Sequence, residues 1–128
     1  MLTLLAMMLG PSGLTDAHAH LIGLGRDLEI VDLRGATSED EVLRRLRAEA
    51  DTIPKGWVLG RGWDQNLWAK DQGSGHASMP THKALSAAFP DRPVWLVRVD
   101  GHAGWANEAA LKAAAITADT ANPEGGEI

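Results

Sequence analysis

The stretch Val94-Trp95-Leu96-Val97-Arg98-Val99 decides the fold class, because every position except Arg98 is apolar. A strand with apolar side chains on both faces is typical of a parallel sheet that is buried on both sides. Pro90 and Pro93 separate this stretch from the segment before it. We therefore expect residues 94–99 to form an interior strand of a parallel α/β sheet.

Two other segments are predicted to be strands of the same sheet. Residues 57–62 read Trp-Val-Leu-Gly-Arg-Gly, and the Gly-x-Gly end suggests that the backbone approaches another group closely. Residues 14–20 read as a short buried strand that ends in two histidines. Between these strands, residues 21–36 contain three glycines and are expected to be loop-like.

Helices are predicted between and after the strands. Ser38 begins one of them, because Ser38-Glu39-Asp40-Glu41 is a capping box and the apolar positions that follow have helical spacing. A short helix is expected over residues 80–89, and another begins at about Asn107, which is a suitable N-cap. Alternating strands and helices indicate βαβ units and a parallel sheet.

His18 and His20 are the candidate metal ligands. On an extended strand, Asp16, His18 and His20 point to the same side, with the two imidazoles about 7 Å apart along the strand. Neutral imidazole binds zinc and similar divalent metals well, so the two rings could converge on one ion. The alternative is that these histidines are ordinary, partly buried polar groups and that Asp16 orients His18 or caps a turn.

Polar and aromatic side chains follow the other two predicted strands. Trp63 and Asp64 follow residues 57–62, and Asp100 and His102 follow residues 94–99. Because ligands of parallel α/β folds bind at the carboxyl ends of the strands, we expect Trp63, Asp64 and His102 to bind substrate. The alternatives are core packing for Trp63, loop bracing for Asp64, and capping of the next helix or a backbone hydrogen bond for His102.

Composition narrows the class of protein further. The length of 128 residues suits one domain, and the net charge of −5 argues against nucleic acid or an anionic membrane as the main partner. Without cysteines, disulfides and thiolate metal sites are excluded. The apolar residues 1–9 have no basic residue before them and are too short to span a membrane. We expect a cytoplasmic protein, and the sequence leaves its oligomeric state open.

The chain resembles the amidohydrolase superfamily, and more narrowly amidohydrolase family 3, which includes N-substituted formamide deformylases. The resemblance covers most of the chain in the family's order. It is carried by Gly13-Leu-Thr-Asp-Ala-His-Ala-His20, Gly56-Trp-Val-Leu-Gly-Arg-Gly-Trp-Asp-Gln-Asn-Leu-Trp68, Pro93-Val-Trp-Leu96, Asp100-Gly-His-Ala-Gly-Trp-Ala-Asn107 and Pro123-Glu-Gly-Gly-Glu-Ile128.

The resemblance implies a (β/α)₈ barrel whose first strand supplies His18 and His20 as ligands to a divalent metal, with zinc favoured. It also implies hydrolysis of C–N bonds in small amide- or formamide-type substrates by metal-activated water. A complete barrel needs roughly 250 residues. We therefore expect residues 1–128 to be the N-terminal part of such a barrel domain, about its first three βα units.

The remaining metal ligands and the catalytic base of the family come from later strands, so no catalytic residue is assigned within this chain. Two ligands would leave the metal weakly held, and the chain alone is expected to lack turnover. The alternative function is a small, non-catalytic α/β module, either a binding module or a remnant without a complete metal site.

Overall fold

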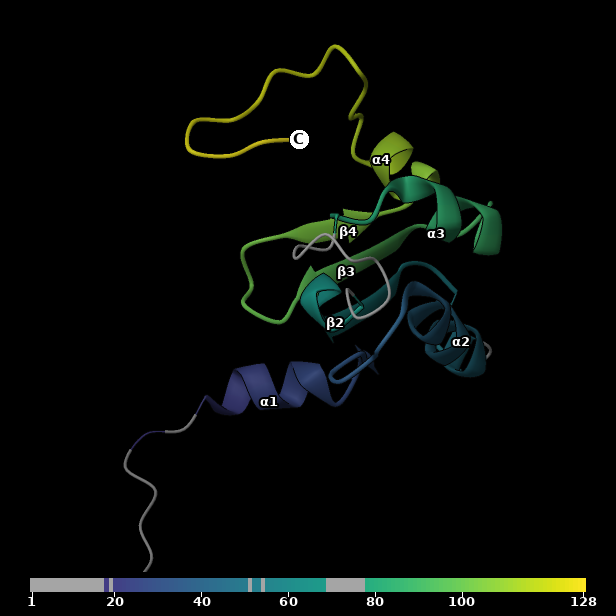
Figure 1. Ribbon diagram of the computed structural model, residues 1–128, viewed down its shortest axis with the longest axis vertical. Helices are drawn as coiled ribbons and strands as arrows, with labels where there is room; N and C mark the ends of the chain where they lie inside the picture. Colours follow the sequence, from purple (N-terminus) through teal and green to yellow (C-terminus); the bar gives the residue numbers. More distant parts are fainter. Residues whose placement is uncertain (1–17, 19, 51, 54, 69–77) are drawn as a thin grey trace, which may run out of the picture.

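The computed structural model describes residues 18, 20–50, 52–53, 55–68 and 78–128. Along the chain they form α1 (Leu21–Asp27), β1 (Val31–Asp32), α2 (Glu39–Ala50), β2 (Val58–Trp63), the 3₁₀ helix η1 (Gln65–Leu67), α3 (His82–Ala88), β3 (Val94–Arg98), β4 (Gly104–Ala106) and α4 (Glu108–Ala113). Figure 1 shows a central sheet beside α2, α3 and α4, with α1 set apart from these three helices.

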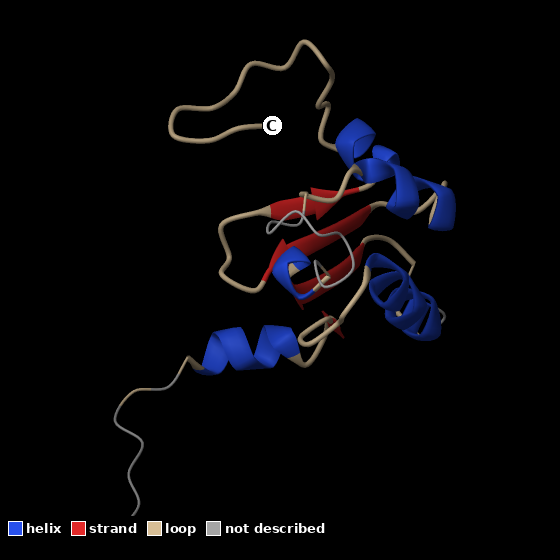
Figure 2. Ribbon diagram, in the orientation of Figure 1, coloured by secondary structure: helices blue, strands red, loops and turns tan. Residues whose placement is uncertain are grey.

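The sheet is open and mixed, with strand order β1-β2-β3-β4. β1 and β2 are parallel, and so are β2 and β3, with Val58 opposite Val94 and Gly60 opposite Leu96. β4 runs antiparallel to β3 (Figure 2). The parallel pairing predicted for residues 57–62 and 94–99 is confirmed, whereas the expectation of a purely parallel sheet is wrong because a short return strand follows β3.

The segment 21–36, expected to be a loop, contains α1 and β1 instead. Leu21, Leu24 and Leu28 have the i, i+3, i+7 spacing of a helix, and this spacing outweighs the glycines at 23 and 25. The strand predicted at 14–20 lies outside the described residues, apart from His18 and His20. Neither of these two belongs to a helix or a strand.

The predicted helix after Ser38 is confirmed as α2. The Glu41 backbone N–H donates to the Ser38 hydroxyl at 3.1 Å, as the capping box requires. The Glu41 carboxylate, however, accepts from the backbone N–H of Thr37 at 2.9 Å rather than from that of Ser38. Val42, Leu43 and Leu46 bury one face of α2 against the sheet.

The core lies on one face of the sheet, between β2, β3 and the helices α2 and α3. Val58, Val94, Leu96 and Leu85 are fully buried there. The opposite face is not covered by any described residue to the same extent, since Leu59 and Trp95 remain 40% and 41% exposed. The prediction that residues 94–99 are buried on both sides is therefore wrong for the described part of the chain.

The side chain of Asn107 is fully buried and links α4 to the sheet through hydrogen bonds. Its Oδ1 accepts from the backbone N–H groups of Val94 and Ala110, each at 2.9 Å. Its Nδ2 donates to the carbonyls of Phe89 and Arg92 at 2.7 and 2.8 Å. The predicted N-cap role is confirmed, and the same amide also joins the end of α3 to the start of β3.

Candidate metal and substrate site

His18 and His20 bring two imidazole nitrogens close together just before α1. Their Nε2 atoms lie 2.9 Å apart, and the ring centroids are 4.8 Å apart at an interplanar angle of 62°. Both side chains are exposed, and the His20 carbonyl accepts the first hydrogen bond of α1, from Leu24, at 2.9 Å. The start of the helix therefore fixes the backbone that carries the second ring.

This separation can be compared with what a shared metal ion requires. Two imidazoles bound at about 2.0–2.1 Å place their nitrogens roughly 2.9–3.4 Å apart for ligand angles between 90° and the tetrahedral value. The observed 2.9 Å is compatible with that range. It also suits a direct hydrogen bond between one protonated and one unprotonated ring nitrogen. The donor set therefore fits a divalent metal but supplies only two ligands.

The described residues hold no group of three or more His, Cys, Asp and Glu side chains that could bind a metal. Asp16, expected on the same face as the two histidines, lies outside the described residues. A third or fourth ligand would thus have to come from outside the described part of the chain.

A second cluster lies where β2 and β3 end. Arg98, at the last position of β3, donates from Nε to Gln65 Oε1 at 2.8 Å and contacts Asp64 Oδ1 through Nη2 at 3.4 Å. Its Nη1 donates to Asp100. Because β2 and β3 are parallel, Arg98 ties together the segments that leave the same edge of the sheet.

His102 is attached to this cluster through Asp100. The His102 backbone N–H donates to Asp100 Oδ1 at 3.1 Å, and its ring Nδ1 lies 3.7 Å from Asp100 Oδ2. The hydrogen bond from the His102 amide and the Arg98 charge hold the pKa of Asp100 below its ordinary value. The His102 side chain is 87% exposed, so its ring is available to a ligand.

Asp64 also has a local structural role, since its Oδ1 accepts from the Asn66 backbone N–H at 3.0 Å and so caps η1. Trp63 is 1% exposed and donates from its indole to the Leu96 carbonyl at 3.0 Å. Trp63, Trp68 and Trp105 form one cluster with ring centroids 5.8–6.1 Å apart. In the described structure Trp63 therefore packs in the core, as its alternative interpretation expected, whereas the Asp64 side chain is partly exposed and that of His102 largely exposed.

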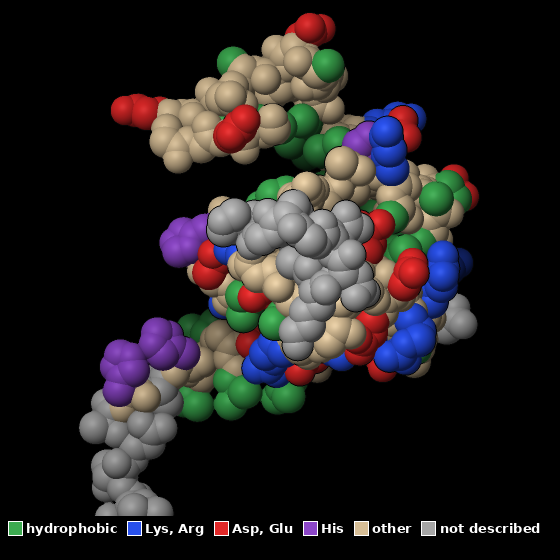
Figure 3. All heavy atoms as spheres, in the orientation of Figure 1, with side chains coloured by type: hydrophobic (Ala, Val, Ile, Leu, Met, Phe, Trp, Pro, Cys, Tyr) green, Lys and Arg blue, Asp and Glu red, His purple; other side chains and the backbone are tan. Residues whose placement is uncertain are grey.

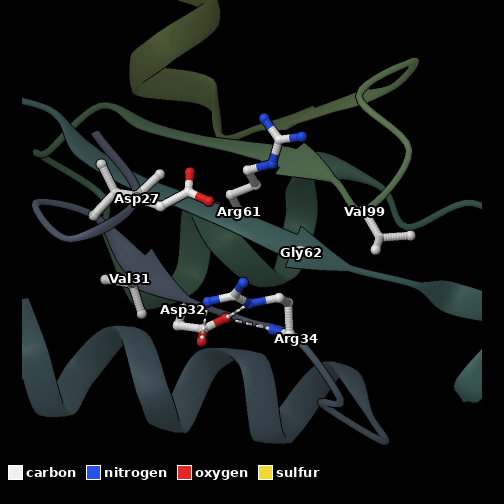
Figure 4. A pocket seen from close by; sticks show the side chains of 8 residues that line it. Asp27, Val31, Asp32, Arg34, Arg61, Gly62 and Val99 are labelled. Atoms are coloured by element: carbon white, nitrogen blue, oxygen red, sulfur yellow. Dashed lines mark hydrogen bonds and ion pairs between the residues drawn. The ribbon is translucent and has the colours of Figure 1, made fainter. Parts of the chain in front are cut away.

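A small pocket of about 200 Å³ lies at the carboxyl ends of β1 and β2 (Figure 4). Asp32 and Arg34 form a two-pronged ion pair on one side, with Arg34 Nε and Nη2 each 2.8 Å from a carboxylate oxygen. This pair lowers the pKa of Asp32. Asp27 and Arg61 lie on the other side. Of the described residues that line the pocket, none is His20, Asp64 or His102.

Arg98 lies at the edge of the sheet where β2 and β3 end, and the sequence alone assigned no function to it. The sequence did contain an indication that Arg98 has a specific role, because it is the one charged residue in an otherwise apolar strand. What the sequence could not show is the register, in which Trp63 lies opposite Arg98 and a bulge between Arg61 and Trp63 shifts the pairing. That register brings Asp64 and Gln65 within reach of the guanidinium.

Comparison with known proteins identifies the family. Residues 11–128 match the family described as "Amidohydrolase family". The chain belongs to amidohydrolase family 3. The resemblance carried by the His-x-His, Gly-Trp-Asp-Gln and Asp-Gly-His segments is thereby confirmed.

Individual relatives agree with this assignment. The chain is 36% identical over 117 residues to the protein LONG AFTER FAR-RED 3 of Arabidopsis thaliana, covering 91% of this chain and 19% of that protein. It is 34% identical over 119 residues to an N-substituted formamide deformylase of Arthrobacter pascens, covering 91% of this chain and 21% of the relative. The chain thus spans about a fifth of the length of these curated relatives.

A solved structure matches as well. An uncharacterised metal-dependent hydrolase from Pyrococcus horikoshii superposes with a TM-score of 0.60 at 35% identity, covering 85% of this chain and 20% of that one. The mixed four-stranded sheet described above therefore corresponds to part of a metal-dependent hydrolase. Within the described residues, no helix combines the length and apolar character needed to cross a membrane.

Proposed function

We propose that residues 1–128 are the N-terminal part of a barrel domain in a metal-dependent hydrolase that cleaves C–N bonds other than peptide bonds. The substrates would be small amide- or formamide-type molecules, and the protein would act in the cytoplasm. Membership of amidohydrolase family 3 and similarity to a formamide deformylase support the reaction class. The observation that carries the proposal is the 2.9 Å separation of the two Nε2 atoms of His18 and His20.

In this proposal His18 and His20 hold a divalent metal, with zinc favoured because both donors are imidazoles. Such an ion supplies Lewis-acid activation of water and of an amide carbonyl. Asp64 and His102 contact the substrate at the carboxyl ends of β2 and β3, and Arg98 holds both segments in place. Trp63 is buried and has an indirect role in this proposal, because its indole donates to the Leu96 carbonyl and so joins β2 to β3 just before Asp64.

The second candidate is a non-catalytic α/β module. It is favoured by one observation, namely that the described residues offer no third metal ligand beside the two histidines. The two candidates differ in what they predict for the longer polypeptide, since only the hydrolase would bind a metal through His18 and His20 and turn over substrate.

Calorimetric titration of the chain with Zn²⁺ tests the proposal. Wild type should bind one ion per chain weakly, and His18→Ala and His20→Ala should each abolish the binding. His102→Ala is the matched control, because that ring is also exposed but belongs to the other cluster. Retention of Zn²⁺ by both His18→Ala and His20→Ala would contradict the metal assignment.

An assay of formamide hydrolysis is the second test of the proposal. The 128-residue chain with Zn²⁺ should not release formate from an N-substituted formamide, whereas a polypeptide extended to the length of the relatives should. His18→Ala in the extended polypeptide should remove bound metal and turnover together. An extended polypeptide that folds, binds no metal and hydrolyses no amide would favour the non-catalytic module instead.

A further inference from the structure

The turn between β3 and β4 carries His102 and is closed by its own backbone. The Arg98 backbone N–H donates to the Ala103 carbonyl at 2.8 Å, and the Gly101 N–H donates to the Arg98 carbonyl at 2.9 Å. Gly101 has a φ of 77°, in the left-handed region that favours glycine. All of these contacts lie within residues 98–103, so the turn is formed by its own residues.

The Asp100 carboxylate lies between the Arg98 guanidinium and His102. Arg98 Nη1 donates to Asp100 Oδ2, and the His102 backbone N–H donates to Asp100 Oδ1 at 3.1 Å. Each carboxylate oxygen thus has a donor, and the same two contacts hold the pKa of Asp100 below its ordinary value. Asp100 is therefore a negatively charged group whose orientation is fixed from both sides.

The His102 ring directs one of its two nitrogens toward this carboxylate. Its Nδ1 lies 3.7 Å from Asp100 Oδ2. A carboxylate oxygen has two lone pairs, so Oδ2 can accept from Nδ1 while it also accepts from Arg98. Contacts of this kind are often longer in a free protein than in its complex with substrate. When a carboxylate accepts from Nδ1 of a neutral imidazole, the proton is fixed there and Nε2 becomes a hydrogen-bond acceptor.

The turn lies on the side of the molecule where the candidate metal site precedes α1. In Figure 1 the start of α1 and the turn between β3 and β4 are both at the left. Figure 3, in the same orientation, shows histidine side chains at two places on this side. In the proposed function, the carbonyl of the amide substrate lies at the candidate metal site of His18 and His20. The N–H of the amide is then the polar group of the substrate that still needs a partner.

We propose that His102 accepts a hydrogen bond from this N–H through Nε2, and that Asp100 is the positioning residue that fixes the required tautomer. The inference rests on the proposed function, because it concerns the amide substrate of the same site. The carboxylates of Asp64 and Asp100 already accept from Arg98 and from backbone N–H groups. The substrate class is thereby narrowed to amides that carry an N–H, since an N,N-disubstituted amide would leave Nε2 without a donor.

Long-range ¹⁵N–¹H NMR of the imidazole rings of the 128-residue chain tests the tautomer without any turnover. At about pH 9, above the range in which histidines titrate, His102 should carry its proton mainly on Nδ1. Asp100→Ser should move the proton mainly to Nε2, because the hydroxyl can still accept from the His102 amide but offers no second oxygen to the ring. Asp119→Ser is the matched control, since Asp119 is an exposed aspartate after α4. The ring of His82 is the internal reference and should not change.

Far-UV circular dichroism should show that both variants remain folded. A His102 proton mainly on Nε2 in wild type would overturn the inference. The same tautomer of His102 in wild type and in Asp100→Ser would overturn it as well.

The substrate preference is measured on the polypeptide extended to the length of the relatives. Its kcat/KM for an N-alkylformamide should exceed that for the N-methyl derivative, which has no N–H, by roughly a hundredfold or more. His102→Ala should reduce this ratio to within about tenfold. Asp100→Ser should also lower the ratio although it leaves the ring in place, which separates a lost hydrogen bond from the bulk of the added methyl group. Asp119→Ser should keep the wild-type ratio.

The outcomes distinguish this inference from the proposed function. Equal kcat/KM values for the two substrates in wild type, or a ratio unchanged by His102→Ala and Asp100→Ser, would overturn the inference while the hydrolase assignment stands. An extended wild type that hydrolyses neither substrate would overturn the proposed function and the substrate preference together.

Discussion

The indole of Trp95 on β3 reaches diagonally over Gly104 on β4, whose partner in the strand register is Val97. A Cβ atom on Gly104 would lie 1.9 Å from Cη2 and 2.3 Å from Cζ2 of this ring, far inside van der Waals contact. β4 itself is only three residues long and pairs with β3 through Val97 and Gly104. The close approach of ring and backbone is therefore part of how the return strand is held against the sheet.

Gly104→Ala should consequently destabilise the fold by about 1–3 kcal/mol, because the indole has to leave its position or β4 has to shift. Urea unfolding at a fixed chain concentration would measure this. Gly25→Ala is the control, since nothing lies within 4 Å of a Cβ there. In the helix α1, that alanine should leave stability unchanged or raise it slightly. Equal stability of Gly104→Ala and wild type would show that the ring moves at no cost.

Asn107→Asp should be more damaging, because all four hydrogen bonds of the buried amide are in use. The carboxylate keeps the two acceptor contacts but places a charged oxygen against the carbonyls of Phe89 and Arg92. We expect a loss of about 2–5 kcal/mol in the free energy of unfolding.

Asn66→Asp is the matched control for this substitution, since Asn66 is exposed on η1. Its effect should stay within about 0.5 kcal/mol. Both variants can be compared by thermal unfolding under the same conditions. A loss at Asn107 no larger than that at Asn66 would mean that the buried amide does not act as the link between α3, β3 and α4.

The sequence predicted the parts of the fold that have strong local signals. The strands predicted at 57–62 and 94–99 are confirmed as β2 and β3, and the capping box at Ser38 marked the start of α2. β1 and β4 were missed because strands of two and three residues carry almost no periodicity, and their pairing depends on the neighbouring strands. α1 was missed because its glycines were interpreted as loop signals.

Part of the candidate site could also be predicted from the sequence. The rule that ligands bind at the carboxyl ends of parallel strands singled out Asp64 and His102, and the structure places both after such ends, linked through Arg98 and Asp100. The roles of Asp64 and His102 toward substrate stay predictions. Arg98 could not be assigned from sequence, since its partners depend on strand register and on a bulge.

The Glu41 carboxylate should make the fold sensitive to acid. The Thr37 backbone N–H and the Arg45 guanidinium, whose Nη2 lies 2.6 Å from Oε1, lower the pKa of Glu41 from 4.5 to about 2. A carboxyl group whose pKa is lower in the folded than in the unfolded chain stabilises the fold at pH values above its unfolded-state pKa. For Glu41 this stabilisation is lost as the pH falls from 4.5 toward 2.

Glu41→Gln should therefore be less stable than wild type at neutral pH, and the difference should close as the pH approaches about 2. The urea midpoint as a function of pH measures this convergence. Glu127→Gln serves as the control, because Glu127 is exposed near the end of the chain and should show no such trend. A constant difference between wild type and Glu41→Gln across the acid range would contradict the role assigned to this carboxylate.

Arg98→Met should loosen the segment that carries His102. The methionine keeps much of the apolar stem but removes the contacts with Gln65, Asp64 and Asp100. Because the Arg98 side chain is only 17% exposed, leaving these partners unpaired should cost about 1–3 kcal/mol. Asp100 would then hold the His102 amide less firmly, since its carboxylate is no longer oriented by the guanidinium.

Hydrogen exchange at the His102 amide reports this loosening directly, and we expect it to accelerate by roughly tenfold or more relative to wild type. Arg61→Met provides the control, because Arg61 is an exposed arginine of the neighbouring strand for which the described part of the chain shows no ion pair. It should leave exchange at His102 unchanged. If Arg98→Met also left that amide as protected as in wild type, the turn at 100–102 would be held by its own backbone. Arg98 would then not be a positioning residue for His102.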